Sequence, residues 1–281
     1  MNGLFVLLLV AGILRQGTLE IDGLKRQFLV YEPETVRALV IALHGGGGNS
    51  YSFVRLTQGR FNVLADSLGF RIVYPDAIDK HWNDGRNLRI YRSHRQKVND
   101  VAFIEALIDS FGTGIPVFIT GMSNGGMMAF RVVCELSGKI DAIATVSSSM
   151  TTYVKNKCKK PPEIPLLMIN GTEDPIVPFY GGIVRFGRLK LGRVLAVMDV
   201  LKFWSGNSCN TVDVIDKVND GTKVEVIQCG GGRAVLYRID HGGHTFPGGL
   251  QYFPERIIGR TTKEINGADV IMRFFSRILE N

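Results

Sequence analysis

The chain has 281 residues, of which 45% are hydrophobic and 21% are charged. These values are typical of a globular protein that can bury a core without metals or other staples. The formal net charge is +7, a sign shared with nucleic-acid-binding proteins, but the basic residues are distributed along the chain without an aromatic-interleaved basic motif. We therefore expect a basic soluble surface and no nucleic-acid partner.

The N-terminus carries an apolar run, Leu4–Leu14, which has the length of a signal-peptide core and is too short to span a bilayer. Its flank, Met1–Gly3, has no Lys or Arg, and Leu9–Ala11 is only a fair cleavage site. We expect residues 1–16 to be a signal peptide of a secreted or periplasmic protein without stable membrane insertion. The alternative is the first strand or helix of a cytoplasmic protein. Residues 17–281 are expected to form a single catalytic domain.

The predicted elements alternate between strands and helices along the chain. Thr18–Ile21 and Arg26–Tyr31 are predicted strands around an Asp22-Gly23 turn. Alternation of this kind predicts an α/β fold with a mostly parallel sheet and helices on both faces, in which ligands bind beyond the carboxyl ends of the strands. Later strands are predicted at 38–43, 71–74, 115–120, 142–147, 165–170, 224–228 and 234–239, and helices at 53–68, 100–111, 124–136, 194–204 and 268–279.

A five-residue segment, Gly121–Gly125, matches the G-x-S-x-G pattern with Ser123 at its centre. In this pattern the serine occupies a sharp, strained turn between a strand and a helix, where side chains at the two flanking glycines would collide. An apolar segment precedes the motif and a helical segment follows it. The context predicts that Ser123 is a nucleophile, and the alternative is a tight structural turn with a capping serine.

The run His44–Gly48 follows a predicted buried strand directly. A glycine loop at this position supplies one backbone N–H to an oxyanion hole, and the residue after the nucleophile supplies the other. We expect the N–H groups of Gly46, to within one residue, and Asn124 to be these donors. His44 is expected to be structural. Taken without the serine motif, the four glycines would indicate only a flexible loop.

The acid and the base of such a site should follow the serine in that order. Asp174 is the predicted acid, because it follows an apolar strand and a turn, and Glu173 is the alternative. His244 is the predicted base, because it follows two glycines beyond the last strand, which suggests a mobile hinged loop. His241 is the alternative, although it lies nearer the strand end. Asp174 would orient the imidazole and stabilise its charged form.

The four cysteines show no CxxC spacing, so the sequence does not predict a zinc site. Their even number is compatible with two disulfides in an oxidising compartment, but three connectivities are open. We expect no cofactor. The cysteines are Cys134, Cys158, Cys209 and Cys229.

Several motifs carry a family resemblance from about residue 26 to the C-terminus. The sequence resembles the polyhydroxybutyrate depolymerase and feruloyl esterase group, the first carbohydrate-esterase family of α/β-hydrolases. The motifs, which are specific in combination, are 43–49 (LHGGGGN), Trp82-Asn83, 99–103 (NDVAF), 121–128 (GMSNGGMM), 170–178 (NGTEDPIVP) and 242–249 (GGHTFPGG).

The resemblance implies an α/β-hydrolase fold with Ser123, Asp174 and His244 as a catalytic triad, in agreement with the positional argument. It also implies disulfides Cys134–Cys158 and Cys209–Cys229, which favour export.

Trp82 resembles the family's aromatic residue in the acyl or aryl cleft, and its alternative role is packing. Phe246 stands where the family often has Trp, so a smaller cleft wall is expected. The basic stretch 86–97 is expected to be a solvated loop, with shaping of the cleft mouth or preference for acidic substrates as alternatives. No lid-sized insertion is apparent, which argues against a true lipase.

The resulting prediction is a serine carboxylic-ester hydrolase that forms an acyl-enzyme on Ser123. Its substrates would be small aryl or acyl esters or polyester oligomers. A peptidase or acyltransferase of the same fold, or a non-catalytic binding protein that kept the fold, are the alternatives. The sequence does not choose among a feruloylated sugar, a hydroxyalkanoate oligomer and other esters, and it does not predict the oligomeric state.

Overall fold

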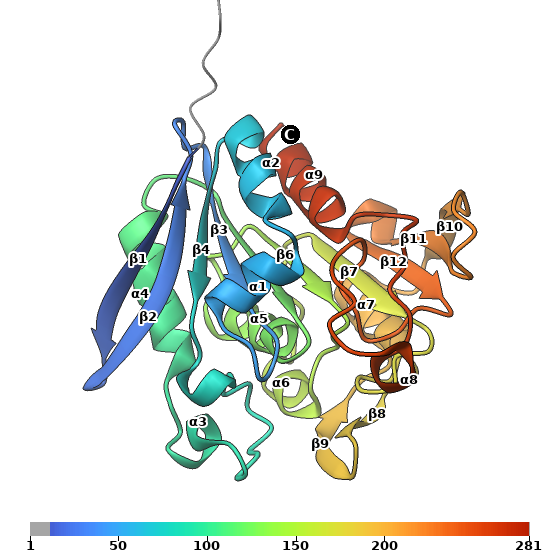
Figure 1. Cartoon of the computed structure of the whole chain (residues 1–281), viewed down its shortest axis with the longest axis horizontal. Coiled ribbons are helices and arrows are strands. Elements are labelled where there is room, and N and C mark those ends of the chain that lie inside the picture. Colours follow the sequence, from blue (N-terminus) through green and yellow to red (C-terminus); the bar gives the residue numbers. More distant parts are fainter. Residues whose placement is uncertain (1–11, 281) are drawn as a thin grey trace, which may run out of the picture.

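A ten-stranded sheet runs through the molecule in the computed structural model, which describes residues 12–280 (Figure 1). Its order is β1-β2-β4-β3-β5-β6-β7-β12-β11-β10. The six central strands, β4, β3, β5, β6, β7 and β12, are parallel to one another. Antiparallel pairs close both edges. The strands are β1 (Ile13–Ile21), β2 (Leu24–Glu32), β3 (Ala38–Leu43), β4 (Phe70–Pro75), β5 (Val117–Met122), β6 (Ala142–Val146), β7 (Leu166–Gly171), β10 (Cys209–Ile215), β11 (Lys223–Cys229) and β12 (Ala234–Asp240).

Helices cover both faces of this sheet, as the alternating sequence pattern predicted. Helices α4, α5 and α7 pack on one face, and α1, α2 and α9 pack on the other, where α2 and α9 lie side by side. The helices are α1 (Ser50–Leu56), α2 (Arg60–Leu68), η1 (Ile78–Lys80), α3 (Arg92–Arg95), α4 (Asp100–Phe111), α5 (Asn124–Glu135), α6 (Thr152–Lys157), α7 (Val197–Ser205), η2 (Gly230–Gly232), α8 (Glu255–Ile258) and α9 (Gly267–Leu279).

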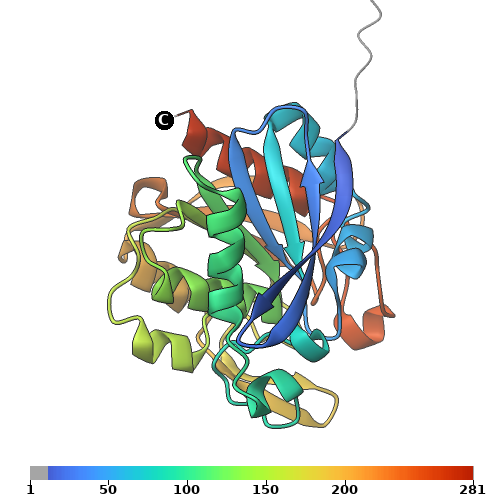
Figure 2. The ribbon, with the colours of Figure 1, turned by 90° about the vertical axis from the view of Figure 1, so that its left-hand side faces the viewer.

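The central strands are buried on both faces, which explains their continuous apolar sequences. Every residue of β3, β5, β6 and β7 is buried. The outer strands β1 and β10 are mostly exposed, and Figure 2 shows β1 and β2 at the near edge of the sheet. The hydrophobic core therefore lies along the six parallel strands, whose carboxyl ends carry the glycine-rich loops.

Three local features differ from the sequence-based expectation. The helix expected at 53–68 is two helices, because Gln58 and Gly59 adopt left-handed backbone conformations that end α1 and begin α2. A separate antiparallel hairpin, β8 (Gly182–Phe186) and β9 (Leu189–Val194), precedes α7. The edge strand β10 was also not predicted, because its exposed residues lack a buried apolar face.

The expected leader, residues 1–16, lies mostly outside the described residues. Its last four residues form the beginning of β1, where Ile13 pairs with Glu32. The expected boundary at residue 16 therefore cuts through a strand of the sheet.

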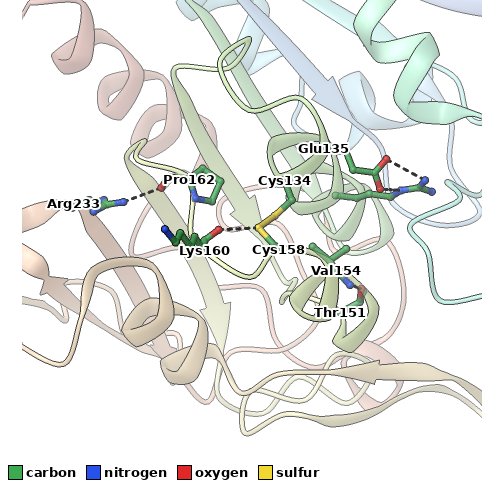
Figure 3. The surroundings of a disulfide bond; sticks show 9 residues. Cys134, Glu135, Thr151, Val154, Cys158, Lys160, Pro162 and Arg233 are labelled. Carbon is green, nitrogen blue, oxygen red and sulfur yellow. Dashed lines mark hydrogen bonds and ion pairs between the residues drawn. A yellow bond between two sulfur atoms is a disulfide. The ribbon is translucent and has the colours of Figure 1, made fainter.

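Two disulfides join cysteines that lie 24 and 20 residues apart in sequence. The Cys134–Cys158 bond connects the end of α5 to the residue after α6, and Figure 3 shows it beside the segment that Arg233 holds through the Pro162 carbonyl. The Cys209–Cys229 bond links directly opposed residues of β10 and β11. These are the pairs that the family resemblance implied.

A buried ion pair fixes the junction between the strand pair β1–β2 and α4. The Arg26 guanidinium lies 2.6 Å from the Asp100 carboxylate, and both side chains are almost fully buried. The Asn83 N–H donates to the other Asp100 oxygen. Burial raises the pKa of Asp100 above its ordinary value even though Arg26 opposes this effect. The pair therefore joins the segment after Trp82 to β2 and the start of α4.

We expect Asp100→Ala to lower the free energy of unfolding by about 3–5 kcal/mol, because it leaves the Arg26 charge buried without a partner. Urea denaturation followed by circular dichroism measures the change. Arg60→Ala, which breaks the more exposed pair with Asp269, is the control and should cost no more than about 1 kcal/mol. Equal losses in the two variants would contradict this account.

Candidate active site

Ser123 occupies the turn between β5 and α5 with φ 54° and ψ −120°, a strained conformation for a non-glycine residue. The flanking glycines are required by close backbone contacts. A Cβ on Gly121 would lie 2.5 Å from the carbonyl carbon of Gly125, and a Cβ on Gly125 would collide with the carbonyl oxygens of Leu43 and His44. The turn thus lies directly against the end of β3.

His244 links Ser123 to Asp174 through a chain of hydrogen bonds. Its Nε2 lies 2.9 Å from the Ser123 Oγ, and its Nδ1 lies 2.7 Å from the Asp174 Oδ2. His244 and Asp174 are 3% and 8% exposed, so both are shielded from bulk water. The expected serine, histidine and acid are therefore brought together within hydrogen-bonding distance.

The Asp174 carboxylate is fixed by the loop that follows β7. Its Oδ1 accepts the N–H groups of Ile176 and Val177, both at 2.8 Å, while Oδ2 remains for the imidazole. Because β7 and β12 are parallel neighbours, the loops after them meet at one edge of the sheet. This adjacency brings the Asp174 loop to the His244 loop.

The His244 loop is closely packed, whereas the sequence had suggested a mobile hinge. The Gly243 N–H donates to the Arg260 carbonyl, and the Tyr252 hydroxyl donates to the His244 carbonyl at 2.8 Å. A Cβ on Gly243 would collide with the backbone of Gly259. Close approach of two backbones is therefore the reason for the glycine. Burial, with a smaller effect from the Asp174 charge, raises the pKa of Tyr252 well above its usual range, so its hydroxyl stays protonated.

The alternative acid and base form a pair of their own away from Ser123. The Glu173 carboxylate lies 2.7 Å from His241 Nδ1, and both side chains are more than 60% exposed. In the structure these two residues interact with each other rather than with the serine.

The two expected donors, the N–H groups of Gly46 and Asn124, have no backbone hydrogen bond among the described residues, and neither does the N–H of Gly45, which lies against Ser123. Gly47 and Gly48 differ, because their N–H groups donate to the carbonyls of Lys80 and Gly45. Asn124 is the first residue of α5, so its N–H is one of the unpaired donors at a helix N-terminus.

The Asn124 side chain is held by a buried network that the sequence analysis missed. Its Oδ1 accepts the Trp82 N–H, and its Nδ2 donates to the Asp84 carboxylate at 2.6 Å. Asp84 also accepts from Arg86. Burial alone would raise the pKa of Asp84, but the Arg86 guanidinium holds it below the ordinary value. A charged pair therefore anchors the residue that follows the nucleophile.

Trp82 does not line the cleft, which corrects the expected substrate-binding role. It is fully buried, packs against the His44 ring, and donates from Nε1 to the His44 carbonyl. His44 is structural as expected: its Nε2 accepts the Ala77 N–H, and burial lowers its pKa to about 4, so the ring is neutral. These contacts fix the start of the glycine loop.

Phe246 is also not a substrate-binding residue. It is 1% exposed and packs edge-on against Phe53 and Phe61 beneath α1 and α2. The prediction rested on its place two residues after His244, and that place does not determine that the side chain turns into the core.

Ser123 opens into a cleft of about 1000 Å³. One wall comes from α1 and the 250–258 segment, and the other comes from the β8–β9 hairpin and residues 81–91. His81 stacks on Tyr91 in this second wall, with ring centroids 3.5 Å apart, and burial lowers the pKa of His81. Apolar and aromatic side chains dominate the lining, which includes Tyr51, Phe53, Leu56, Met127, Ile176, Val184, Phe186, Leu191, Leu250, Tyr252 and Phe253.

The stretch 86–97 is only partly the solvated loop that the sequence suggested. Arg86 and Tyr91 line the cleft, and Ser93 and His94 are buried. Arg86 also donates to the Leu191 carbonyl, which ties this stretch to the β8–β9 hairpin. The alternative interpretation, that the stretch shapes the cleft mouth, agrees with these contacts.

Within residues 12–280, no group of three or more His, Cys, Asp or Glu side chains is arranged to hold a metal ion. In the same part of the chain, no helix combines the length and apolar character needed to cross a membrane.

Comparison with known proteins places this geometry in a wider context. No family model matches the chain. The chain is 25% identical over 263 residues to NocK of Nocardia uniformis subsp. tsuyamanensis, a protein named as an esterase. This match covers 85% of the chain and 74% of the relative. It is also 25% identical over 245 residues to feruloyl esterase C of Emericella nidulans, covering 82% and 80% of the two chains.

Among solved structures, a CIB-like hydrolase of Thermoplasma acidophilum superimposes with a TM-score of 0.59 at 15% identity. The match covers 95% of this chain and 99% of that one. The chain has the α/β-hydrolase fold. The fold class and the resemblance to feruloyl esterases predicted from sequence motifs are both confirmed.

We expect Asp84→Ala to slow covalent labelling of Ser123 by a fluorophosphonate about 10- to 100-fold, because Asn124 would lose its anchor beside the reacting atoms. Asp84→Asn can still accept from the Asn124 amide and is the matched control, with a smaller expected loss. Labelling at wild-type rate in Asp84→Ala would show that the network does not position Asn124.

Proposed function

We propose that this α/β-hydrolase is a serine carboxylic-ester hydrolase in which Ser123, His244 and Asp174 form the catalytic triad. The observation that carries the proposal is the continuous hydrogen-bond chain from Asp174 through His244 to Ser123. Beside it lie the two unengaged N–H groups of Gly46 and Asn124. This combination supplies a nucleophile, a base and oxyanion donors at one point.

In the first step, His244 Nε2 accepts the Ser123 hydroxyl proton while Oγ attacks the ester carbonyl carbon. Asp174 accepts the hydrogen bond from Nδ1 and stabilises the imidazolium that forms. The carbonyl oxygen becomes negative and is stabilised by the N–H groups of Gly46 and Asn124. Removal of one such donor typically costs about 3 kcal/mol of transition-state stabilisation.

In the second half of the reaction, the imidazolium donates its proton to the leaving alcohol as the tetrahedral species collapses to an acyl-enzyme on Ser123. A water molecule then loses a proton to His244 and attacks the acyl carbon, which releases the acid and regenerates the serine. These steps require only groups of this chain and water.

The substrate class follows from the cleft and the relatives. A mostly apolar cleft of about 1000 Å³ can enclose an aryl or short acyl group. The first candidate is a hydroxycinnamate ester, because several relatives are named feruloyl esterase C. The second candidate, from the sequence motifs, is a polyester oligomer. We propose a small or oligomeric ester as substrate.

We also propose that the protein is exported, because disulfides form and persist in oxidising compartments. The two bonds, Cys134–Cys158 and Cys209–Cys229, support this proposal. Since β1 begins at Ile13, removal of a leader near Ala11 would leave that strand whole, whereas removal of residues 1–16 would shorten it.

Ser123→Ala should lower kcat/KM for p-nitrophenyl acetate by about three or more orders of magnitude, because it removes the nucleophile. Circular dichroism should show an unchanged fold. Wild-type-like hydrolysis by this variant would overturn the proposal. A peptidase on the same fold would instead cleave an anilide as readily as the matching aryl ester.

Methyl ferulate should be hydrolysed with a higher kcat/KM than methyl esters of long fatty acids, because an aryl group fits a cleft walled by aromatic and short apolar side chains. A panel of methyl esters with matched leaving groups measures this ratio. Preference for hydroxybutyrate oligomers over ferulate in a parallel assay would assign the enzyme to the polyester-cleaving branch instead.

A further inference from the structure

The positive charge of the chain is concentrated in two segments. Residues 86–97 and 175–198 together contain nine Arg and Lys residues and no Asp or Glu. The remaining 24 basic and 26 acidic residues give the rest of the chain a net charge of −2, although the whole chain carries +7. The first segment is the basic stretch already apparent in the sequence, whereas the second segment lies far from it along the chain.

The fold brings these two segments together. Leu88 and Tyr91 of the first segment pack against the cluster that contains Val184 and Leu191 of the β8–β9 hairpin. Arg86 reinforces the contact by donating to the Leu191 carbonyl at 2.6 Å. In both views α3 and the hairpin project from the same end of the molecule (Figures 1 and 2).

Eight of the nine cations are exposed and form no ion pair with a carboxylate of the described residues. The ninth, Arg86, is paired with Asp84 inside the cleft wall. We refer to the eight side chains as the basic surface, which consists of Arg89, Arg92, Arg95, Lys97, Arg185, Arg188, Lys190 and Arg193.

The hairpin carries a charge arrangement that does not stabilise it. Arg185 and Lys190 are directly opposed partners on β8 and β9. Like charges at such positions destabilise a strand pair, and no acidic residue of the hairpin compensates. An anion bound between the two strands would relieve this repulsion.

The basic surface begins at the mouth of the cleft. Phe186 and Leu191 of the hairpin line the cleft, and the cations Arg185 and Lys190 directly precede them in sequence, so these two cations lie on the opposite face of the hairpin. On the other segment, Tyr91 lines the cleft directly before Arg92. A chain molecule whose ester lies at Ser123 would therefore pass Arg92 beside the cleft and would have to extend over the hairpin to reach Arg185 and Lys190.

We propose that the basic surface binds a soluble polymer that carries carboxylates at regular intervals and presents its ester groups to the cleft. The inference rests on the proposed function, because it assigns the surface to the ester-bearing substrate. Many exposed cations, none paired with a carboxylate of the described residues, complement a chain of separated negative charges. The ester would then be cleaved from an acidic polymer rather than from a neutral one.

A polymer fits these residues better than a lipid surface does. Elements that lie in a membrane interface present a continuous apolar face beside their cations. Here the exposed large apolar side chains of residues 175–198 are Tyr180, Phe186 and Leu189, in a segment that also carries four cations. The other segment has one such residue, Ile90.

The test compares two triple variants that change the net charge equally. Arg185→Glu/Arg188→Glu/Lys190→Glu alters the hairpin, and Arg15→Glu/Lys25→Glu/Arg37→Glu alters exposed residues at the opposite edge of the sheet. Binding to fluorescently labelled polygalacturonate is measured by anisotropy at low ionic strength. We expect the hairpin variant to bind at least about tenfold more weakly and the control to change less than about twofold, with added salt weakening the wild type.

Three results would overturn the proposal. The wild type could fail to bind polygalacturonate, or both variants could lose binding equally, which would indicate a net-charge effect alone. Third, the wild type could bind vesicles of phosphatidylcholine and phosphatidylglycerol in equal amounts, or a single-stranded oligonucleotide, more tightly than it binds polygalacturonate. Either result would assign the surface to a different partner.

The same variants separate this proposal from the proposed function. Both triple variants should hydrolyse p-nitrophenyl acetate as the wild type does, since none of the substituted residues lines the cleft. Ser123→Ala should bind polygalacturonate normally. Loss of polymer binding with retained hydrolysis in the hairpin variant would support the basic surface and leave the catalytic proposal unaffected. Retained hydrolysis in Ser123→Ala would contradict the catalytic proposal and leave the basic surface unaffected.

Discussion

At the carboxyl edge of the sheet, backbone segments touch one another with no side chain between them. The Ser123 turn lies against the end of β3 through Gly125, and the loops after β7 and β12 meet through Gly171 and Gly242. A Cβ at Gly125 or Gly171 would collide with backbone atoms, which cannot move aside as a flexible side chain does, and a Cβ at Gly242 would collide with the Ile239 side chain. The distances among serine, histidine and acid depend on these contacts, because each functional residue lies within three positions of one of these glycines.

Hydrogen bonds hold the residues of the site in place in addition to these backbone contacts. Asp174 is fixed by two N–H groups, His244 by the Tyr252 hydroxyl, and Asn124 by the Asp84 carboxylate. The Asp84 charge is balanced by Arg86, so the anchor places little net negative charge beside the position where an oxyanion would form. Since Arg86 also reaches β9, one ion pair connects the loop after the nucleophile with the hairpin wall of the cleft.

The sequence predicted the elements whose signals are local. Gly121–Gly125 lies between a buried strand and a helix, and the order of serine, acid and histidine followed from fold rules. Trp82 and Phe246 were assigned to the cleft incorrectly, because an aromatic residue near a motif gives no information on which way its side chain turns. Asp84 and Arg86 were missed because their partners, Asn124 and Leu191, are contributed by distant segments. For the same reason, the sequence predicted the basic stretch 86–97 but not its proximity to the cations of the β8–β9 hairpin.

The central claim is that these backbone contacts build an oxyanion site beside Ser123. It is tested most directly by a crystal structure of the enzyme with a diethyl phosphoryl group on the Ser123 Oγ. The account predicts that the phosphoryl oxygen lies about 2.7–3.1 Å from the backbone nitrogens of both Gly46 and Asn124. A phosphoryl oxygen directed toward solvent, or bound by other donors, would contradict it.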